Sequence, residues 1–128
     1  MQFGIGIENF GRTVHSDSMR HIAHAAEELE YDSVWATDHI IVPQTDSEPY
    51  GRIFECVVTL AMLASVTQRV RLGTSVVVLP MREPILFAKQ IATIDAASHG
   101  RMVGGDGSVA AVDIPYCAHE SRQNGCHP

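Results

Sequence analysis

The stretch SVWATDH, residues 33 to 39, begins as a buried strand and ends in two side chains that can exchange protons. Ser33 to Ala36 combine small, β-branched and aromatic residues, which suit a pleated sheet. Packing gives no reason for a carboxylate and an imidazole to follow such a strand side by side. The fold and the function of the chain therefore both turn on what surrounds Asp38 and His39.

A helix is predicted before this strand, from Ser16 to about Leu29. Its apolar residues recur three or four positions apart, which places them on one buried stripe. The stripe consists of Met19, Ile22, Ala23, Ala26 and Leu29. A first strand is predicted earlier still, from Gln2 to Ile7, so the chain opens as strand, helix, strand.

The same order continues along the chain. A second helix is predicted at about 52–67, and a third, β-branched strand over 69–79 ends at Pro80. A third helix begins at Pro84 and is capped by Gly100, after which residues 101–103 look like the start of a fourth strand. This alternation predicts an α/β fold with a parallel sheet covered by helices. An open doubly wound sheet and part of a (β/α)8 barrel both fit it.

Both architectures bind ligands at the carboxyl ends of their strands, and Asp38 and His39 lie just past such an end. Residues 40–50 form a loop that is longer than a connection requires, which is typical of binding loops. One interpretation is a cofactor-contacting carboxylate beside a general base, because histidine can accept a proton near neutral pH. The other is an aspartate that braces the loop, beside a solvated histidine.

A second candidate feature is the step Gly73-Thr74-Ser75-Val76 inside the valine-rich strand. Small residues weaken a strand, and they often mark a bulge or the close approach of a ligand. The alternative is a step that lets a helix pack closely against the sheet.

Composition excludes several classes of function. The chain has 128 residues, enough for one domain, and a formal net charge of −6, which gives no reason to expect nucleic acid or an anionic membrane as partner. No apolar run is long enough for a membrane span, and the N-terminus lacks the pattern of a signal peptide. Three cysteines are too few for a disulfide framework. We therefore expect a cytoplasmic protein with reduced thiols.

From Gly104 onward the pattern changes, because residues 104–128 contain four glycines and no helical stripe. We expect this tail to be irregular and residues 1–103 to form the ordered domain. Its residues Cys117, His119, Cys126 and His127 would permit a zinc site, but their spacing matches no standard pattern. His21 and His24 share a helix face without a carboxylate to complete a ligand set. No metal is therefore expected.

The chain resembles the N-terminal half of the luciferase-like monooxygenases, the bacterial luciferase superfamily. Four stretches carry the resemblance, in order and at the right spacing: FGIGI, AEELEYDSVWATDH, LAMLASVTQRVRLGTSVVVLP and EPILFAKQIATIDAASHGR. The resemblance implies a partial TIM (β/α)8 barrel of about three βα units and the start of a fourth strand. It also implies an oxidoreductase that uses FMN or the deazaflavin coenzyme F420 on a small organic substrate, by monooxygenation or by hydride transfer.

The resemblance also assigns roles to residues. Asp38 matches a cofactor-contacting aspartate and His39 the adjacent catalytic base. Ser75 and Val76 match a cofactor-binding position at which the family often has a cis peptide bond that supports the flavin ring. Two positions depart from the family, because Glu30 and His99 stand where glycines are usual.

The largest departure is the tail, and it raises an alternative function. A complete barrel has about 250 residues and binds phosphate after its seventh and eighth strands. A chain of 128 residues would lack that anchor, so we expect it to bind flavin weakly or not at all on its own. Its open sheet edges predict self-association into a homo-oligomer. The alternative is therefore a truncated, inactive fragment or a self-associating interaction module of the same fold.

Overall fold

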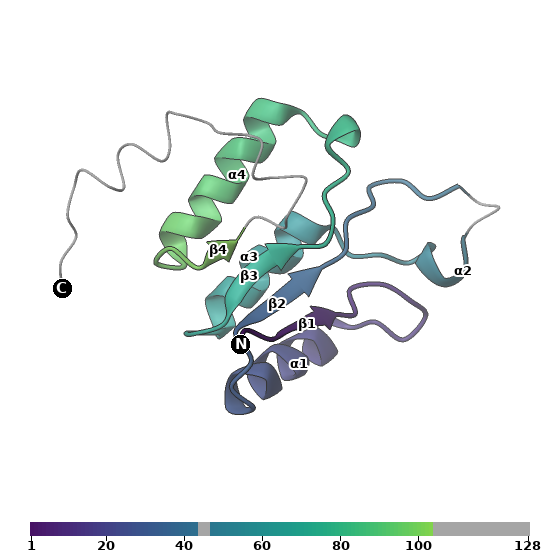
Figure 1. Cartoon of the computed structure of the whole chain (residues 1–128). Coiled ribbons are helices and arrows are strands. Elements are labelled where there is room, and N and C mark those ends of the chain that lie inside the picture. Colours follow the sequence, from purple (N-terminus) through teal and green to yellow (C-terminus); the bar gives the residue numbers. More distant parts are fainter. Residues whose placement is uncertain (44–46, 104–128) are drawn as a thin grey trace.

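The computed structural model describes residues 1–43 and 47–103, which form a parallel sheet covered by helices (Figure 1). The strands are β1 Gly4–Ile7, β2 Ser33–Ala36, β3 Arg71–Thr74 and β4 Met102–Val103. The helices are α1 Ser16–Glu28, α2 Ser47–Tyr50, α3 Cys56–Val66 and α4 Pro84–Ala97, with a short 3-10 helix, η2, at Leu79–Met81. The predicted α/β class is confirmed. The predicted tail, with its possible zinc ligands, lies outside the described residues.

All four strands run parallel, in the order β1-β2-β3-β4. Their register aligns Ile5, Val34 and Leu72 in one row across the sheet and Gly6, Trp35 and Gly73 in the next. Because successive side chains of a strand point to opposite faces, the first row faces the helices and the second faces away from them. The sheet has the strand order and direction of part of a (β/α)8 barrel.

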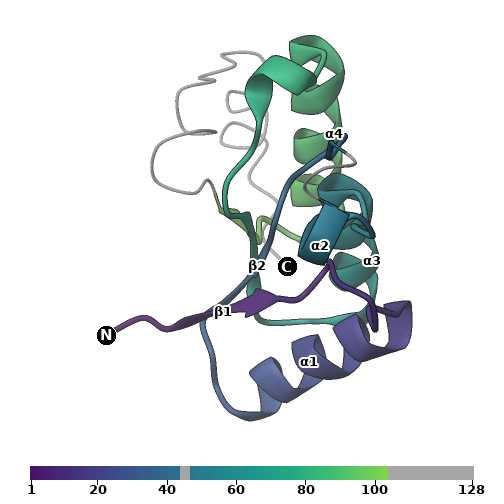
Figure 2. The same cartoon turned by 90° about the vertical axis from the view of Figure 1, so that its right-hand side faces the viewer.

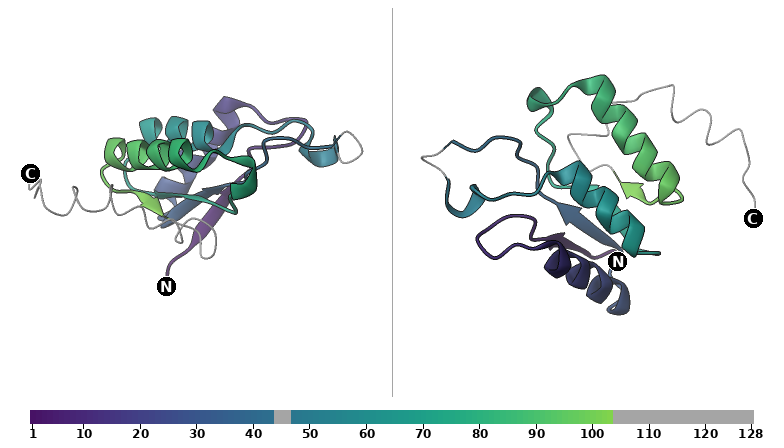
Figure 3. Two further views of the ribbon diagram at one scale, coloured as in Figure 1. Left: turned by 90° about the horizontal axis from the view of Figure 1, so that it is seen from above. Right: turned by 180° about the vertical axis from the view of Figure 1, so that it is seen from behind.

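Helices α1, α3 and α4 form a single layer on one face of the sheet (Figures 2 and 3). The core lies between this layer and the sheet, and it is almost wholly aliphatic. Its largest fully buried apolar side chains are Ile7, Met19, Leu60, Leu63, Leu72, Val34 and Val70. None of the helices in the described part of the chain is both long enough and apolar enough to cross a membrane.

The opposite face of the sheet carries Trp35, whose ring lies across neighbouring glycines. Its indole N–H donates to Ser33 Oγ at 2.9 Å, which fixes the ring along its own strand. A Cβ added at Gly73 would lie 2.5 Å from two ring carbons of Trp35. Glycine at position 73 therefore makes room for Trp35. The alternative interpretation, that this small residue lets a helix pack closely, is wrong for Gly73, because the ring lies on the face opposite the helix layer.

Two predicted boundaries were also wrong. The third strand ends at Thr74 rather than at residue 79, because the chain leaves the sheet after Ser75 and buries Val77 from a loop instead. Leu29 was predicted to belong to the buried stripe of α1, but it follows the last helical residue and is 71% exposed. Met19, Ala23 and Ala26 of that stripe are buried as predicted.

The two residues that replace expected glycines both adopt left-handed backbone. Glu30 has φ 60° and His99 has φ 59°, and each lies just beyond the end of a helix, α1 or α4. This conformation is one that glycine adopts without strain and other residues adopt at a cost.

Candidate active site

The residues predicted to form the site come together at the carboxyl ends of β2 and β3. Ala36 and Thr74, the last residues of these strands, are register partners. The Ser75 N–H continues the ladder by donating to the Ala36 carbonyl at 2.9 Å. Asp38 follows β2 and Val76 follows β3, so the loops that contain them leave the sheet side by side. The Ser75–Val76 peptide bond is cis, as the resemblance predicted.

The Asp38 side chain is directed into the protein and is fully buried. Its Oδ2 accepts from the Val78 N–H at 2.9 Å and from Arg82 Nε at 3.0 Å. Its Oδ1 accepts from Arg82 Nη2. Both carboxylate oxygens are therefore bonded to the segment that follows β3, and the aspartate braces the two loops against each other.

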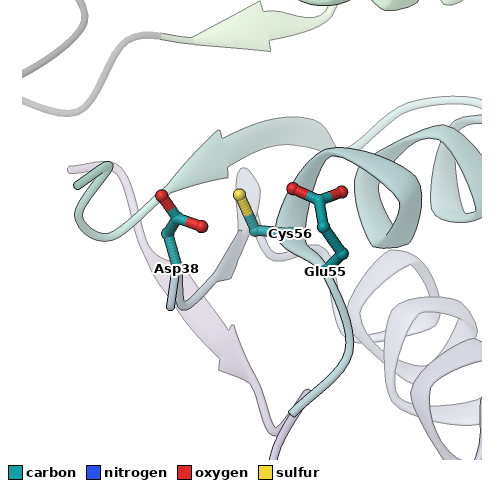
Figure 4. Close-up of side chains that lie close together, drawn as sticks. All are labelled: Asp38, Glu55 and Cys56. Atoms are coloured by element: carbon teal, nitrogen blue, oxygen red, sulfur yellow. The ribbon is translucent and has the colours of Figure 1, made fainter. Parts of the chain in front are cut away.

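Arg82 connects Asp38 to the start of α3. Its Nη2 also donates to Glu55 Oε1 at 2.6 Å and contacts Cys56 Sγ at 3.3 Å. Figure 4 shows the three groups around this position: Asp38 from the loop after β2, and Glu55 and Cys56 from the first turn of α3. The guanidinium also lies 5.1 Å from the centre of the Phe87 ring, a cation–π contact. The Arg82 side chain is 7% exposed, so this is a nearly buried ion-pair network.

Burial and charge act in opposite directions on these groups. Burial alone would raise the pKa of Asp38, but the hydrogen bonds from Arg82 and from the Val78 N–H outweigh it, so the pKa lies below its ordinary value. Burial and the neighbouring Asp38 carboxylate raise the pKa of the Cys56 thiol well above its usual range. Asp38 is therefore ionised and Cys56 is a neutral thiol at neutral pH.

A second network holds the backbone just before Asp38. Asn9 is fully buried, and its Nδ2 donates to the carbonyls of Thr37 and Phe54 at 2.8 and 2.9 Å. Its Oδ1 accepts from the Thr37 N–H at 3.0 Å. Both backbone groups of Thr37, its N–H and its carbonyl, are thus held by Asn9, a residue that follows β1.

His39, by contrast, points outward. Its ring is exposed and stacks on Tyr50 of α2, with 6.0 Å between ring centroids. Tyr50 in turn lies 4.9 Å from the ring of Phe10. The loop after β1 and the segment before α3 are joined by hydrogen bonds, among them Gly11 N–H to the Arg52 carbonyl at 2.9 Å. The imidazole is therefore placed on the surface beside the ring of Tyr50.

Comparison with known proteins decides the family. The model of the family described as luciferase-like monooxygenase matches residues 1–109 of the chain. The chain belongs to the luciferase-like monooxygenase family.

Individual members of the family extend this result. The chain is 34% identical over 89 residues to an F420-dependent glucose-6-phosphate dehydrogenase of Amycolatopsis mediterranei, which covers 69% of this chain and 26% of the relative. The structure of the monooxygenase RslO1 from Streptomyces bottropensis superposes with a TM-score of 0.63 at 27% identity, covering 82% of this chain and 32% of that one.

A third member shows the fold with a bound flavin. The oxygenating constituent of 3,6-diketocamphane monooxygenase from Pseudomonas putida, solved in complex with FMN, superposes with a TM-score of 0.66 at 19% identity, covering 91% of this chain and 32% of that one. The family thus contains both F420-dependent and FMN-dependent enzymes. The chain spans about a quarter of the length of the curated relatives it matches.

Three residues of this candidate site were not predicted from the sequence: Asn9, Glu55 and Arg82. Asn9 follows β1 at the same sheet edge as Asp38, so the rule that drew attention to Asp38 would also have found it. Glu55 accepts from the Val58 N–H at 2.7 Å as the N-cap of α3, a role that its position before an apolar run indicates. For Arg82 the sequence holds no signal, because its partners lie 26 to 44 positions away.

A metal ion was not expected in this luciferase-like chain, and one group of side chains bears on that expectation. The ligand atoms of Asp38, Glu55 and Cys56 lie within 4.8 Å of one another, which is close enough for a shared ion. All three contact Arg82 Nη2, whose positive charge opposes a cation at the same place. The group is better described as the set of acceptors for Arg82.

Proposed function

We propose that this chain forms one wall of the active site of an oxidoreductase that uses FMN or the deazaflavin coenzyme F420. The reaction is oxidation of a small organic substrate with reduced flavin and oxygen, or hydride transfer with the deazaflavin. The observation that carries the proposal is that His39 and the Ser75–Val76 peptide follow the register-paired ends of β2 and β3, in a chain of the luciferase-like family. These are the ends at which barrel enzymes bind their ligands.

The residues at this edge fit the ring of a flavin. Val76 and Ile41, which follow β3 and β2, are 59% and 70% exposed. Apolar side chains exposed at a ligand-binding edge offer surface that a planar ring can cover. When bound, the flavin supplies the acceptor or donor of the hydride. The backbone of Ser75 and Val76 would lie under that ring.

His39 is proposed as the group that moves the proton. Its imidazole is exposed, so it can reach a substrate hydroxyl or carbonyl oxygen placed beside the ring. Tyr50 lies beside the imidazole, with 6.0 Å between the ring centroids and 18° between the ring planes. Asp38 would contribute to cofactor binding by holding the loop in place, because its carboxylate is occupied by Arg82 and the Val78 N–H.

Fluorescence titration of the purified chain with FMN and with F420 tests the proposal. We expect weak but saturable binding that Val76→Asp weakens further, since a carboxylate beside the ring opposes an anionic cofactor. Leu29→Asp is the matched control, because Leu29 is 71% exposed and follows α1, at the opposite end of the strands from the site. Equal loss of binding in both variants would show that the ring does not lie on Val76.

Turnover separates the role of His39 from binding. With bound cofactor, His39→Ala is expected to reduce the rate by a factor of about 10² to 10⁴ while leaving flavin affinity within a factor of two or so. The control is His24→Ala, an exposed histidine on α1. A rate unchanged by His39→Ala would exclude it as the proton-transferring group.

A self-associating module is the second candidate function. Within the described residues, β1 and β4 each have one neighbouring strand, so each presents a free edge. In the described part of the chain, no helix covers the sheet face that carries Trp35 (Figure 3). A folded chain that binds neither cofactor and sediments as a dimer or larger species would favour this candidate. A folded monomer that binds flavin would exclude it.

A further inference from the structure

We propose that Arg82 is the positioning residue of this site and that Asp38 acts as its buried anchor rather than as a direct contact of the cofactor. The proposal rests on the function proposed above and deepens it. It concerns how the corner that presents His39 is held to the loop that follows β3.

The first step is that the Asp38 carboxylate is closed to a ligand, because none of its side chain is exposed. The side chain is 0% exposed, and three donors reach its two oxygens. A flavin hydroxyl or ring nitrogen could reach this carboxylate only by displacing Arg82 or opening the loop at Val78. Either change would break hydrogen bonds of a buried ion pair and leave charged groups without partners.

The second step is that Arg82 joins three elements that are remote in sequence. Its Nε and Nη2 donate to Asp38 after β2, and Nη2 also donates to Glu55 at the start of α3. Arg82 itself lies between η2 and α4. Glu55 uses its other oxygen, Oε2, to cap α3 through the Val58 N–H. The line Val78–Asp38–Arg82–Glu55–Val58 therefore ties both loops of the site to the helix layer.

The third step is that two contacts hold the chain just before His39, one from Arg82 and one from Asn9. Asn9 holds the backbone of Thr37, and Arg82 holds the side chain of the next residue, Asp38. His39 is the first residue beyond both contacts. The Val78 N–H bond does the same for the chain two residues past the Ser75–Val76 peptide. Loss of the guanidinium releases both loops together.

The fourth step is that the chemistry requires a guanidinium. Arg82 donates from Nε and Nη2 in the fixed plane of the fork, and it bridges two carboxylates. A lysine ammonium offers a point charge that cannot make the bidentate contact with Asp38. Arg82→Lys therefore keeps the charge of the network and removes its geometry.

The experiment is a double-mutant cycle on the full chain with Arg82→Lys, Asp38→Asn and the double variant. NMR without cofactor records the amide signals of Val78 and His39 and the Nε–H signal of Arg82. We expect each single variant to shift the Val78 and His39 signals in the same way, and the double variant to shift them no further. The control is Arg12→Lys, whose partner Glu48 is 3.9 Å away and whose side chain is 85% exposed.

The cofactor gives the second arm of the cycle. If the chain binds flavin, the two single variants and the double variant should all weaken binding by the same factor, about 10-fold, because positioning errors of about 1 Å have effects of this order or larger. Methylguanidinium should restore the Val78 and His39 signals of Arg82→Ala and should leave Arg12→Ala unchanged. Such rescue is not expected of a general loss of stability.

The outcomes separate this proposal from the proposed function. Additive effects, or a Val78 signal unchanged in Arg82→Lys, would overturn the positioning role. Weaker flavin binding in Asp38→Asn but not in Arg82→Lys would restore Asp38 as a direct contact. If the unmodified chain binds no flavin, the proposed function fails, and the NMR arm still decides whether Arg82 and Asp38 act as one unit.

Discussion

Arginine and carboxylate side chains act in opposite ways at the two ends of the parallel strands, here called the amino edge and the carboxyl edge. At the amino edge, where α1 and α4 end and β3 and β4 begin, charged groups bond to backbone. Arg101 donates five hydrogen bonds, four of them to main-chain carbonyls, of Ala64, Thr67, Val70 and Ser98. Glu27 accepts from the N–H groups of residues 68, 69 and 70 through one oxygen.

At the carboxyl edge, charged groups bond to one another. Arg82 joins the carboxylates of Asp38 and Glu55, and each carboxylate accepts one further bond from the backbone, from Val78 and Val58 respectively. Charged side chains that bond to backbone groups fix the conformation of the main chain. Charges that satisfy other side chains hold those side chains in place, which is what a site needs. The amino edge therefore stabilises the fold and the carboxyl edge holds the proposed site, the arrangement of (β/α)8 barrels generally.

The largest effect is expected from Arg101→Ala at the amino edge. The substitution removes all five donors of the guanidinium and leaves several partly buried carbonyls without partners, so the free energy of unfolding should fall by about 3 kcal/mol. Urea denaturation followed by circular dichroism measures the loss. Arg71→Ala is the control, since Arg71 makes one exposed bond, to Gln2 at 2.7 Å, and should change stability by less than about 0.5 kcal/mol.

The middle of the sheet supplies the next test, because it belongs to neither edge. Gly73→Ala places a Cβ 2.5 Å from the ring of Trp35, and we expect a loss of about 1–3 kcal/mol from the displaced ring. Gly6→Ala on β1 is the matched control, because nothing lies within 4 Å of its added Cβ. Thermal unfolding of both variants compares them, and equal melting temperatures would mean that Trp35 does not lie over Gly73.

Glu27→Gln sharpens the comparison through pH. Burial opposes ionisation of Glu27, but three backbone N–H bonds outweigh burial and lower its pKa. A carboxyl group with a lowered pKa stabilises the fold above its unfolded pKa of about 4.3 and loses that contribution as pH falls through the folded value. We expect Glu27→Gln to cost about 1 kcal/mol at pH 7 and to flatten the fall in stability below about pH 4.

Urea unfolding at a series of pH values between neutral and acid measures this effect. The lowered pKa of Asp38 acts in the same direction, so acid sensitivity should be reduced in Glu27→Gln but not abolished. A steeper loss in the variant than in the unmodified chain would contradict the assigned sign.

The smallest effect is expected where the backbone is strained at the amino edge. Glu30→Gly relieves a left-handed residue after α1, and its φ of 60° suits glycine. Part of the gain is offset by the greater freedom of glycine in the unfolded chain, so stability should rise by about 0.5 kcal/mol. Differential scanning calorimetry resolves such a change. Arg20→Gly, inside α1 and exposed, should instead destabilise the chain by about 1 kcal/mol.

Much of the fold could be predicted because periodicity is local. The stripe of α1 and the apolar second strand follow from spacing within about a dozen residues. The third strand was predicted too long, because the valines that follow Thr74 have the composition of a strand while the ladder no longer continues. Burial of Val77 in a loop satisfies the same hydrophobicity without sheet hydrogen bonds, and composition cannot distinguish the two.

By itself, the sequence determined the alternation of strands and helices, the parallel sheet, the family, and the position of Asp38 and His39 at a strand end. These depend on short-range patterns and on motifs read in order. Only the tertiary structure decided that Asp38 is a buried anchor, that Arg82 and Asn9 hold the corner, and that Gly73 makes room for Trp35. Those contacts join residues 26 to 44 positions apart or on different strands, and a hydrogen bond of about 3 Å leaves no trace in the spacing of the chain.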